Sequence, residues 1–486
     1  MKQTSISSLK VFAILLIVLG GMVLPSHARD LTDVFSRGST FAVPGAANPL
    51  TTGQAVQQLS SGFAEAVSQA VTQEFPLAAV APAFTYRYNP AISVFERSSN
   101  VPGPIFSERA PTLGPGRWNL SLGYSYIDFS DFNGQSLHRL RSPGLILEGL
   151  LDQGVDAGRA ADGTPLQVVP IVASRIHTRI DLNAHVFVPT LRYGLTDRWD
   201  VSLSIPVVDT FLRVKNTDVP DVEVDFSQFG LLFTKPAVGT PQFRILLNRQ
   251  TGQRGDIRTT PFIKSTRPGR VLTKTAGSAT GVGDITLRSK YHFWDTDGGG
   301  AAFGLNLQLP SGEVRDFHGT DETHVSPYLY LSQIVAERFE PHLNIGFDLN
   351  TGDVGRSSAI YAVGATALVG KDLGISIDFL GRHEFEGFRF TPTAENLYEG
   401  PLLGRSSKTC TAAQPCFVDP TDVQRHVSFL PFFPARFKRN DIADVSFGLR
   451  YALGTQGSVF FGGIVPLNDD GLRAGFIPSG GLEYGF

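Results

Sequence analysis

The chain has 486 residues, a net charge of -3 and 42% apolar side chains, and its mean hydropathy is close to zero. The balanced charge excludes the basic footprint of a nucleic-acid-binding protein. No run of about 20 apolar residues follows residue 28, which excludes a spanning helix from there on. The apolar residues must instead be distributed along the chain in a pattern.

The N-terminus has the features of a secretory signal peptide. Lys2 and Lys10 precede an apolar run at 11–24, and Ser26-His27-Ala28 offers a cleavage site between small residues. We expect residues 1–28 to be removed after export, which places the mature chain outside the cytoplasm.

Residues 29–116 lack strand alternation and predict a separate N-terminal region. An amphipathic helix is predicted at about 53–74, and Pro-rich extended sequence follows it. Its apolar residues recur at helical spacing: Val56, Leu59, Phe63, Val67 and Val71. The region is either a plug inside a barrel or a periplasmic extension under its rim, and the plug is favoured because the apolar stripe needs a partner.

Residues 117–486 alternate between apolar and polar side chains, which indicates strands with one greasy and one wet face. Short turns alternate with long loops at 130–173, 214–280 and 386–440, a pattern typical of a transmembrane barrel. We predict an all-β fold: an antiparallel up-and-down barrel of about 12 strands, with 14 possible if 214–280 holds another hairpin. A soluble sandwich is the alternative. The strands are expected near 117–129, 174–193, 199–213, 281–294, 301–310, 325–335, 341–350, 358–369, 374–385, 441–452, 458–467 and 473–486.

The polar rows of these strands are the candidate lumen-lining residues. If the apolar rows face lipid, the polar rows converge inside the barrel. Their mixed charges indicate internal ion pairs and hydrogen bonds. Either they satisfy one another and the plug, which is favoured for any single residue, or a subset of them lines a permeation path. The candidates are His177, Arg179, Asp181, Asn183, His185, Asp284, Arg288, Lys290, His292, Asn306, Gln308, Asn344, Asp348 and Arg450.

The two cysteines, Cys410 and Cys416, lie in the longest late loop. In an oxidising compartment a disulfide between them is the favoured interpretation. A metal site is less favoured, because the sequence nearby offers no further metal ligands. No arrangement of nucleophile, base and orienting group is apparent, so we expect neither an enzyme nor a cofactor.

Several motifs resemble an outer-membrane family named for the meta-pathway of phenol degradation. Gly103-Pro104-Ile105-Phe106-Ser107-Glu108-Arg109-Ala110 is similar to a subset with an N-terminal extension. The other motifs are Leu191-Arg192-Tyr193-Gly194-Leu195-Thr196-Asp197-Arg198-Trp199-Asp200-Val201, Gly281-Val282-Gly283-Asp284-Ile285-Thr286-Leu287 and Leu343-Asn344-Ile345-Gly346-Phe347. The resemblance implies an outer-membrane channel or transporter, and the family name implies aromatic catabolism.

Together these observations predict an outer-membrane channel of a Gram-negative-type bacterium for passive uptake of small, hydrophobic or aromatic molecules. The alternative is a structural or adhesive barrel that binds partners through its long loops; a lipid hydrolase is less favoured. The expected partners are outer-membrane lipid, a small-molecule solute and the barrel-assembly machinery, which would bind the C-terminal strand ending in Phe486.

Overall fold

The computed structural model describes residues 30–39, 67, 70–71, 81–89, 94–97, 99–141, 146–235, 237–238, 243–253, 262–386 and 441–486. Cys410, Cys416 and the predicted signal peptide at 1–28 lie outside these residues. The predicted helix at 53–74 also lies largely outside them, although Val67, Ala70 and Val71 are helical. None of the helices in this described part has the length and apolarity that a membrane crossing requires.

Twelve antiparallel crossings form a closed barrel, so the predicted all-β barrel of 12 strands is confirmed. Three crossings consist of two successive strands each. Closure is made where the last crossing pairs with the first, for example Leu482 with Leu122. The crossings are β3 (Trp118–Phe132), β9 (Ile171–Thr196), β10 with β11 (Trp199–Ser204, Val207–Val224), β15 with β16 (Arg270–Val282, Ile285–Thr296), β17 (Gly299–Leu309), β18 (His324–Gln333), β19 (Phe339–Asn350), β20 (Ser358–Val369), β21 (Leu373–Glu384), β22 (Ile442–Leu453), β23 (Gly457–Pro466) and β24 with β25 (Leu472–Ala474, Ile477–Gly485).

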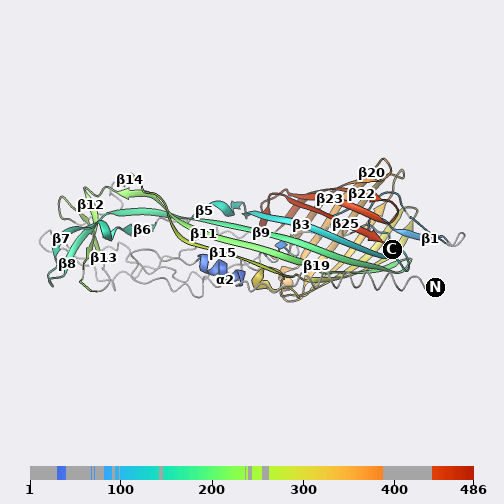
Figure 1. Cartoon of the computed structure of the whole chain (residues 1–486), viewed down its shortest axis with the longest axis horizontal. Helices are drawn as coiled ribbons and strands as arrows, with labels where there is room; N and C mark the ends of the chain where they lie inside the picture. Colours follow the sequence, from blue (N-terminus) through green and yellow to red (C-terminus); the bar gives the residue numbers. More distant parts are fainter. Residues whose placement is uncertain are drawn as a thin grey trace.

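One end of the barrel, here called the turn end, carries the tight turns. Gly370 and Gly454 adopt φ values of 69° and 67° there. Glycine reaches this left-handed region without the steric cost of a Cβ atom, which allows strands to reverse within a few residues. The chain also ends at this side of the barrel, as Figure 1 shows.

The opposite end carries a long extension that the sequence analysis treats as loops. β9 has 26 residues, more than twice the roughly 9–11 that a membrane crossing needs. β11 continues to Val224 and β15 begins at Arg270, so strands take up much of the predicted long loop at 214–280. These strands run side by side out of the barrel in Figure 1.

A separate four-stranded sheet lies at the tip of the extension. It contains the extra hairpin that a 14-strand barrel would require, so this hairpin adds no crossing to the barrel. The sheet has the order β13 (Phe243–Asn248), β12 (Phe229–Thr234), β8 (Pro165–Val169), β7 (Val155–Arg159). The remaining elements of the extension are β4 (Gln135–Ser136), η1 (Leu137–Arg139), β5 (Leu140–Arg141), β6 (Ile146–Gly149), η2 (Leu151–Gln153) and β14 (Phe262–Lys264).

The barrel proper has an apolar outside and a polar inside. Leu305, Ile345 and Ile377 point outward at mid-strand and are 42%, 44% and 60% exposed. The alternate positions, such as Ser326 and Asp378, are buried. A soluble protein would not leave a continuous apolar belt in water, whereas lipid solvates such a belt. The closed barrel therefore spans a membrane, as predicted.

This polarity inverts where the strands pass into the extension. On β9, Thr190 faces inward opposite Ser121 of β3 and Ser204 of β10. Farther out, Val186 faces inward opposite Val208 of β11. The inward-facing side chains are thus polar where the apolar belt surrounds the barrel, and apolar in the extension above the belt. We infer that the membrane surface lies near this level, because above it water replaces lipid on the outside.

The described N-terminal elements lie at both levels. α2 (Leu31–Ser39) packs against β11, β15 and η3 (Val314–Asp316), inside the extension. A small hairpin, β1 (Tyr86–Asn89) with β2 (Val94–Arg97), lies at the turn end, where the Tyr86 hydroxyl donates to the Thr455 carbonyl at 3.0 Å. The short helix η4 (Val354–Arg356) follows β19 at the other end of the barrel.

Candidate functional site

Residues 99–113 cross the turn-end half of the lumen and bind inward-facing side chains on many strands. Ser107 is buried, and its hydroxyl donates to Asp378 Oδ1 at 2.7 Å and contacts His342 Nε2 at 2.8 Å. Nearby, the Ala110 amide donates to Ser332 Oγ at 3.0 Å. The segment thus replaces water as the hydrogen-bond partner of the polar lumen wall.

Glu108 forms hydrogen bonds through its carboxylate and through its backbone. Its carboxylate accepts from Lys290 Nζ at 3.1 Å and from Arg192 at 3.2 Å. Its backbone amide donates to Asn344 Oδ1 at 2.7 Å, while Asn344 Nδ2 donates back to the Glu108 carbonyl at 2.8 Å. These reciprocal bonds fix both the position and the orientation of the chain in the lumen.

Lys290 connects this site to the residues that follow. Its ammonium group also donates to the carbonyls of Arg109 and Pro111, at 3.1 and 2.9 Å. The Leu113 amide donates to Asp200 Oδ2 at 3.1 Å, and Asp200 lies 3.9 Å from Lys290. The segment is therefore held by charged groups at every few residues.

A second attachment lies on the side of the barrel formed by β22 and β25. Arg450 is buried and donates to the carbonyls of Ala81 and Pro104 at 3.1 and 3.2 Å. It also forms an ion pair with Glu483 at 3.4 Å, and Glu483 accepts from the Ala83 amide at 2.7 Å. Arg450 and Glu483 thus attach two stretches of the N-terminal region to β22 and β25, which lie on either side of β23.

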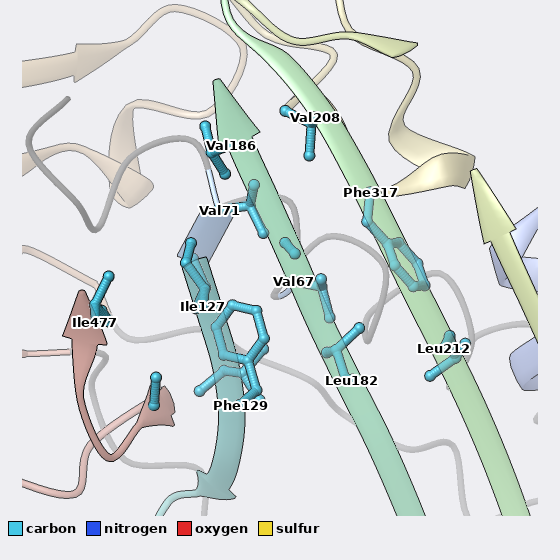
Figure 2. Close-up of a cluster of buried hydrophobic side chains, with 14 of the residues drawn as sticks. Val67, Val71, Ile127, Phe129, Leu182, Val186, Val208, Leu212, Phe317 and Ile477 are labelled. Carbon is cyan, nitrogen blue, oxygen red and sulfur yellow. The ribbon is translucent and has the colours of Figure 1, made fainter. Parts of the chain in front are cut away.

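Apolar side chains of the described N-terminal residues are buried inside the extension. Figure 2 shows Val67 and Val71 among inward-facing residues of β3 and β9, including Ile127, Leu182 and Val186. Leu31, Val34 and Phe35 of α2 belong to the same buried cluster. The described residues of the N-terminal region therefore lie in the interior at two levels, with apolar contacts in the extension and polar contacts in the lumen.

A cavity of about 140 Å³ remains above residues 106–108, toward the extension. Its wall combines apolar, aromatic and charged groups. The lining residues are Phe106, Ser107, Glu108, Arg288, Asn306, Tyr328, Tyr330, Asn344, Ile360, Tyr361, Ala362, Leu380, Gly381, Arg382, Ile442 and Asp444.

Nine of the predicted lumen residues face inward in the barrel. Arg288, Asn306 and Asn344 line the cavity, and Lys290 and Arg450 hold the N-terminal segment. Three others form hydrogen bonds along the wall. Asp284 accepts from Gln308 and Thr320, and Asp348 accepts from Ser326, His324 and Arg382. The last one, His292, is buried near the turn end. Whether any of them lines a permeation path is a proposal taken up below.

The prediction is wrong for the polar row of β9. His177, Arg179, Asp181, Asn183 and His185 point outward from the extension, and Arg179 Nε donates to Asp181 at 2.8 Å on that surface. The opposite row, including Ile180 and Leu182, is fully buried. Alternation defines two faces of a strand, but the outward face is polar here because this part of β9 lies above the apolar belt.

The sequence analysis missed the residues of the N-terminal region that contact the lumen. Ser107, Glu108 and Arg109 form a polar cluster within a Pro-rich stretch, which is an unusual composition for a simple linker. Tyr328, Tyr330 and Glu340 were missed as well, because their strands were assigned without naming every inward residue.

Comparisons with known proteins agree on the architecture. Residues 171–376 match the model of the family described as MetA-pathway of phenol degradation, which confirms the resemblance for somewhat less than half of the chain. A search of curated proteins finds no match.

Among solved structures, the chain is similar to the COG4313 outer membrane channel from Pseudomonas putida F1, with 10% identity and a TM-score of 0.36 over 78% of this chain and 98% of that one. It is also similar to a Pseudomonas aeruginosa FadL homologue (9% identity, TM-score 0.29, covering 76% and 89%). A third is the Ralstonia pickettii toluene transporter TbuX (10% identity, TM-score 0.21, covering 76% and 88%). Values this low carry no property of those proteins over to this chain.

Proposed function

Because the protein is a closed outer-membrane β-barrel, we propose that it is a channel for passive uptake of small molecules, with hydrophobic or aromatic solutes as the preferred class. The observation that carries the proposal is the order of the wall surfaces along the interior. An apolar interior in the extension leads to a cavity that is partly aromatic and then to a polar lumen. A hydrophobic solute that enters from outside would first meet the apolar side chains of the extension. Contact with these side chains is more favourable for such a solute than contact with water or with the polar headgroups at the membrane surface. The description of the matched family model also points to aromatic compounds.

Residues 29–116 act as the gate of this channel in our proposal. Their described part fills the interior at two levels, and both contact sets consist of non-covalent bonds to the barrel wall. The contacts in the lumen are mainly ion pairs and hydrogen bonds. Water can replace the segment as the bonding partner of these wall groups once the segment moves. Among the predicted lumen residues, Arg288, Lys290, Asn306, Asn344 and Arg450 would then line the open path.

Permeation into liposomes tests this function. Phenol and sugars of increasing size are offered to vesicles that contain the full-length protein or a variant lacking residues 29–116. The account predicts slow phenol entry with the full-length protein and faster entry with the deletion variant. Equal, background-level entry for both, with folding verified by heat-modifiable migration in gels, would contradict a channel function.

A second candidate function is supported by the tip of the extension. The sheet β13-β12-β8-β7 has its own core, which includes Val169, Leu231 and Phe233, and it projects far from the barrel. A folded head on a long stalk suits a structural or adhesive protein that binds partners outside the cell. Replacing residues 150–170 and 226–250 by short linkers would abolish partner binding without altering permeation if this function is the main one.

Two assembly steps follow from the same proposal. The sequence at 1–28 would direct export and be cleaved after Ala28. The barrel-assembly machinery would recognise the C-terminal strand, in which Tyr484 and Phe486 stack with ring centroids 6.2 Å apart. Replacing Phe486 by Ala should lower the amount of assembled barrel in the outer membrane, which membrane fractionation can measure.

A further inference from the structure

The charged residues that line the cavity above residues 106–108 are two arginines and two carboxylates, namely Arg288, Arg382, Glu108 and Asp444. Arg288 lines it from β16, and this guanidinium forms neither a hydrogen bond nor an ion pair with any residue that the structure describes. Its Nε atom is shielded from solvent. The residue as a whole is half-buried, and a guanidinium without a hydrogen-bonded partner on a cavity wall is suited to bind an anion there.

The carboxylates around the cavity form their ion pairs with other cations, and Glu108 attracts Arg288 only from beyond ion-pair distance. Glu108 pairs with Lys290 at 3.1 Å and Arg192 at 3.2 Å. On the other side, Asp444 pairs with Arg473.

The third carboxylate, Asp348, belongs to a neighbouring group of bonds. It lies 3.4 Å from Arg382 and 3.0 Å from His324 Nδ1. With these acids engaged, an anion that enters the cavity meets Arg288 without displacing an internal ion pair.

The rest of the wall suits one planar ring. Tyr328 and Tyr330 stack with ring centroids 5.5 Å apart and an interplanar angle of 10°. Phe106, Ile360 and Leu380 add apolar surface. A cavity of about 150 Å³ is known to hold one benzene ring, and the volume here is about 140 Å³. The space therefore fits a single ring with a small substituent.

A hydrogen-bonding side chain completes the polar side of the cavity. Asn306 is the direct cross-strand partner of Arg288, and both line the space. The amide of Asn306 can donate to one oxygen of an anion while the guanidinium binds the other. Charge, ring stacking and volume thus converge on one class of ligand.

We propose that this cavity is a binding site for a small aromatic carboxylate, with Arg288 pairing with the carboxylate and Tyr328 and Tyr330 contacting the ring. The inference rests on the proposed channel function, since a solute bound between the extension and residues 106–108 would be in transit. It narrows the solute class from aromatic molecules in general to monoaromatic acids.

Calorimetric binding of benzoate and benzamide to the full-length protein in detergent tests the site. The two probes have nearly the same shape, but only benzoate is charged. The wild-type protein should bind benzoate at least tenfold more tightly than benzamide. Arg288→Gln should remove this preference by weakening benzoate binding far more than benzamide binding, and Arg288→Lys should retain part of the preference. Arg338→Gln, a change at an exposed arginine in a turn, serves as the matched control and should have no effect.

A further change tests the location. Leu380→Phe, which fills the cavity without altering its charge, should weaken binding of both probes. Equal affinity for benzoate and benzamide in the wild-type protein would overturn the proposal, and so would an unchanged preference after Arg288→Gln. These outcomes are independent of permeation: phenol flux without benzoate binding would overturn the site alone, and benzoate binding without flux would overturn the channel alone.

Discussion

Arg109 and Glu340 form an ion pair in which the side chains are only 1% and 0% exposed. Arg109 Nε donates to Glu340 Oε1 at 3.1 Å, and a second guanidinium nitrogen donates to the other carboxylate oxygen. The pair joins the N-terminal segment to the turn end of β19. Its geometry makes it the most direct point at which to test whether this segment is a removable gate.

Replacing Glu340 by Gln should weaken the attachment of residues 99–113. Removing one partner of a buried pair leaves an uncompensated charge and typically costs about 3–5 kcal/mol. We expect faster cleavage of the segment by added protease and higher conductance in planar bilayers.

The exposed Glu337 provides the control for this prediction, since it lies in the adjacent turn. Glu337→Gln should leave cleavage and conductance unchanged. The double change Arg109→Met with Glu340→Leu should restore much of the closure, because an apolar pair can replace a buried ion pair. Identical behaviour of Glu340→Gln and wild type would mean that the segment is not held here.

The polarity inversion predicts different costs for the same substitution on two outward positions. Leu305→Arg places a charge in the apolar belt at mid-strand and should destabilise the barrel by about 2–4 kcal/mol. Ser278→Arg is also outward, but it lies on β15 in the extension, where water surrounds the chain; its cost should stay within about 0.5 kcal/mol. Unfolding free energies measured in lipid vesicles check both values. Similar destabilisation at the two sites would mean that the inferred position of the membrane surface is wrong.

The packing of α2 depends on the absence of a side chain at Gly277. A Cβ atom there would lie 2.8 Å from Val34 Cγ2 and 3.4 Å from Leu31 Cδ2. Because the branched Val34 side chain has few alternative rotamers, Gly277→Val should displace α2 and speed its amide hydrogen exchange. Valine itself suits a strand, so the barrel should remain folded. Ser278→Val, on the outward face, should leave exchange in α2 unchanged, and equal exchange in both variants would argue against this contact.

His318 makes the loop between β17 and β18 sensitive to acid. Burial lowers the pKa of His318 to about 4, although its ring contacts the Ala279 carbonyl at 3.2 Å and Asp209 lies nearby. The packed loop therefore binds fewer protons than the open loop between pH 6.5 and 4. Its stability is full above pH 6.5 and falls with decreasing pH, by on the order of 3 kcal/mol once the pH reaches 4.

Hydrogen exchange of residues 310–323 measures this effect. Exchange should accelerate as the pH falls from 6.5 to 4, after correction for the intrinsic rate. His318→Gln should flatten the profile, whereas His383→Gln, at an exposed histidine on β21, should not. A wild-type profile that is flat over this range would contradict the assignment.

The barrel could be predicted from the sequence because its information is local. Alternation along 301–310 or 441–452 sets the faces of a strand, and glycines in the intervening turns set its ends. The sequence also contains the inversion in β9, where the apolar row shifts from Ile180 and Leu182 to Leu191 and Tyr193. Treating the strand as having one outward face throughout concealed this shift.

The contacts of the N-terminal segment could not be predicted in the same way. Glu108 and Asn344 are 236 positions apart, and Arg109 and Glu340 are 231 apart. No local pattern links residues at such separations. Lys290 and Asn344 were identified as inward residues from alternation alone, but their partners became apparent only when the closed barrel set the distances.

The central claim is that a membrane-spanning barrel is closed by its own N-terminal region. Single-channel recording in planar bilayers, with the full-length protein and a variant lacking residues 29–116, tests it most directly. We predict small or rare openings for the full-length protein and a steady, larger conductance for the variant. A folded variant that conducts no more than the full-length protein would contradict the account.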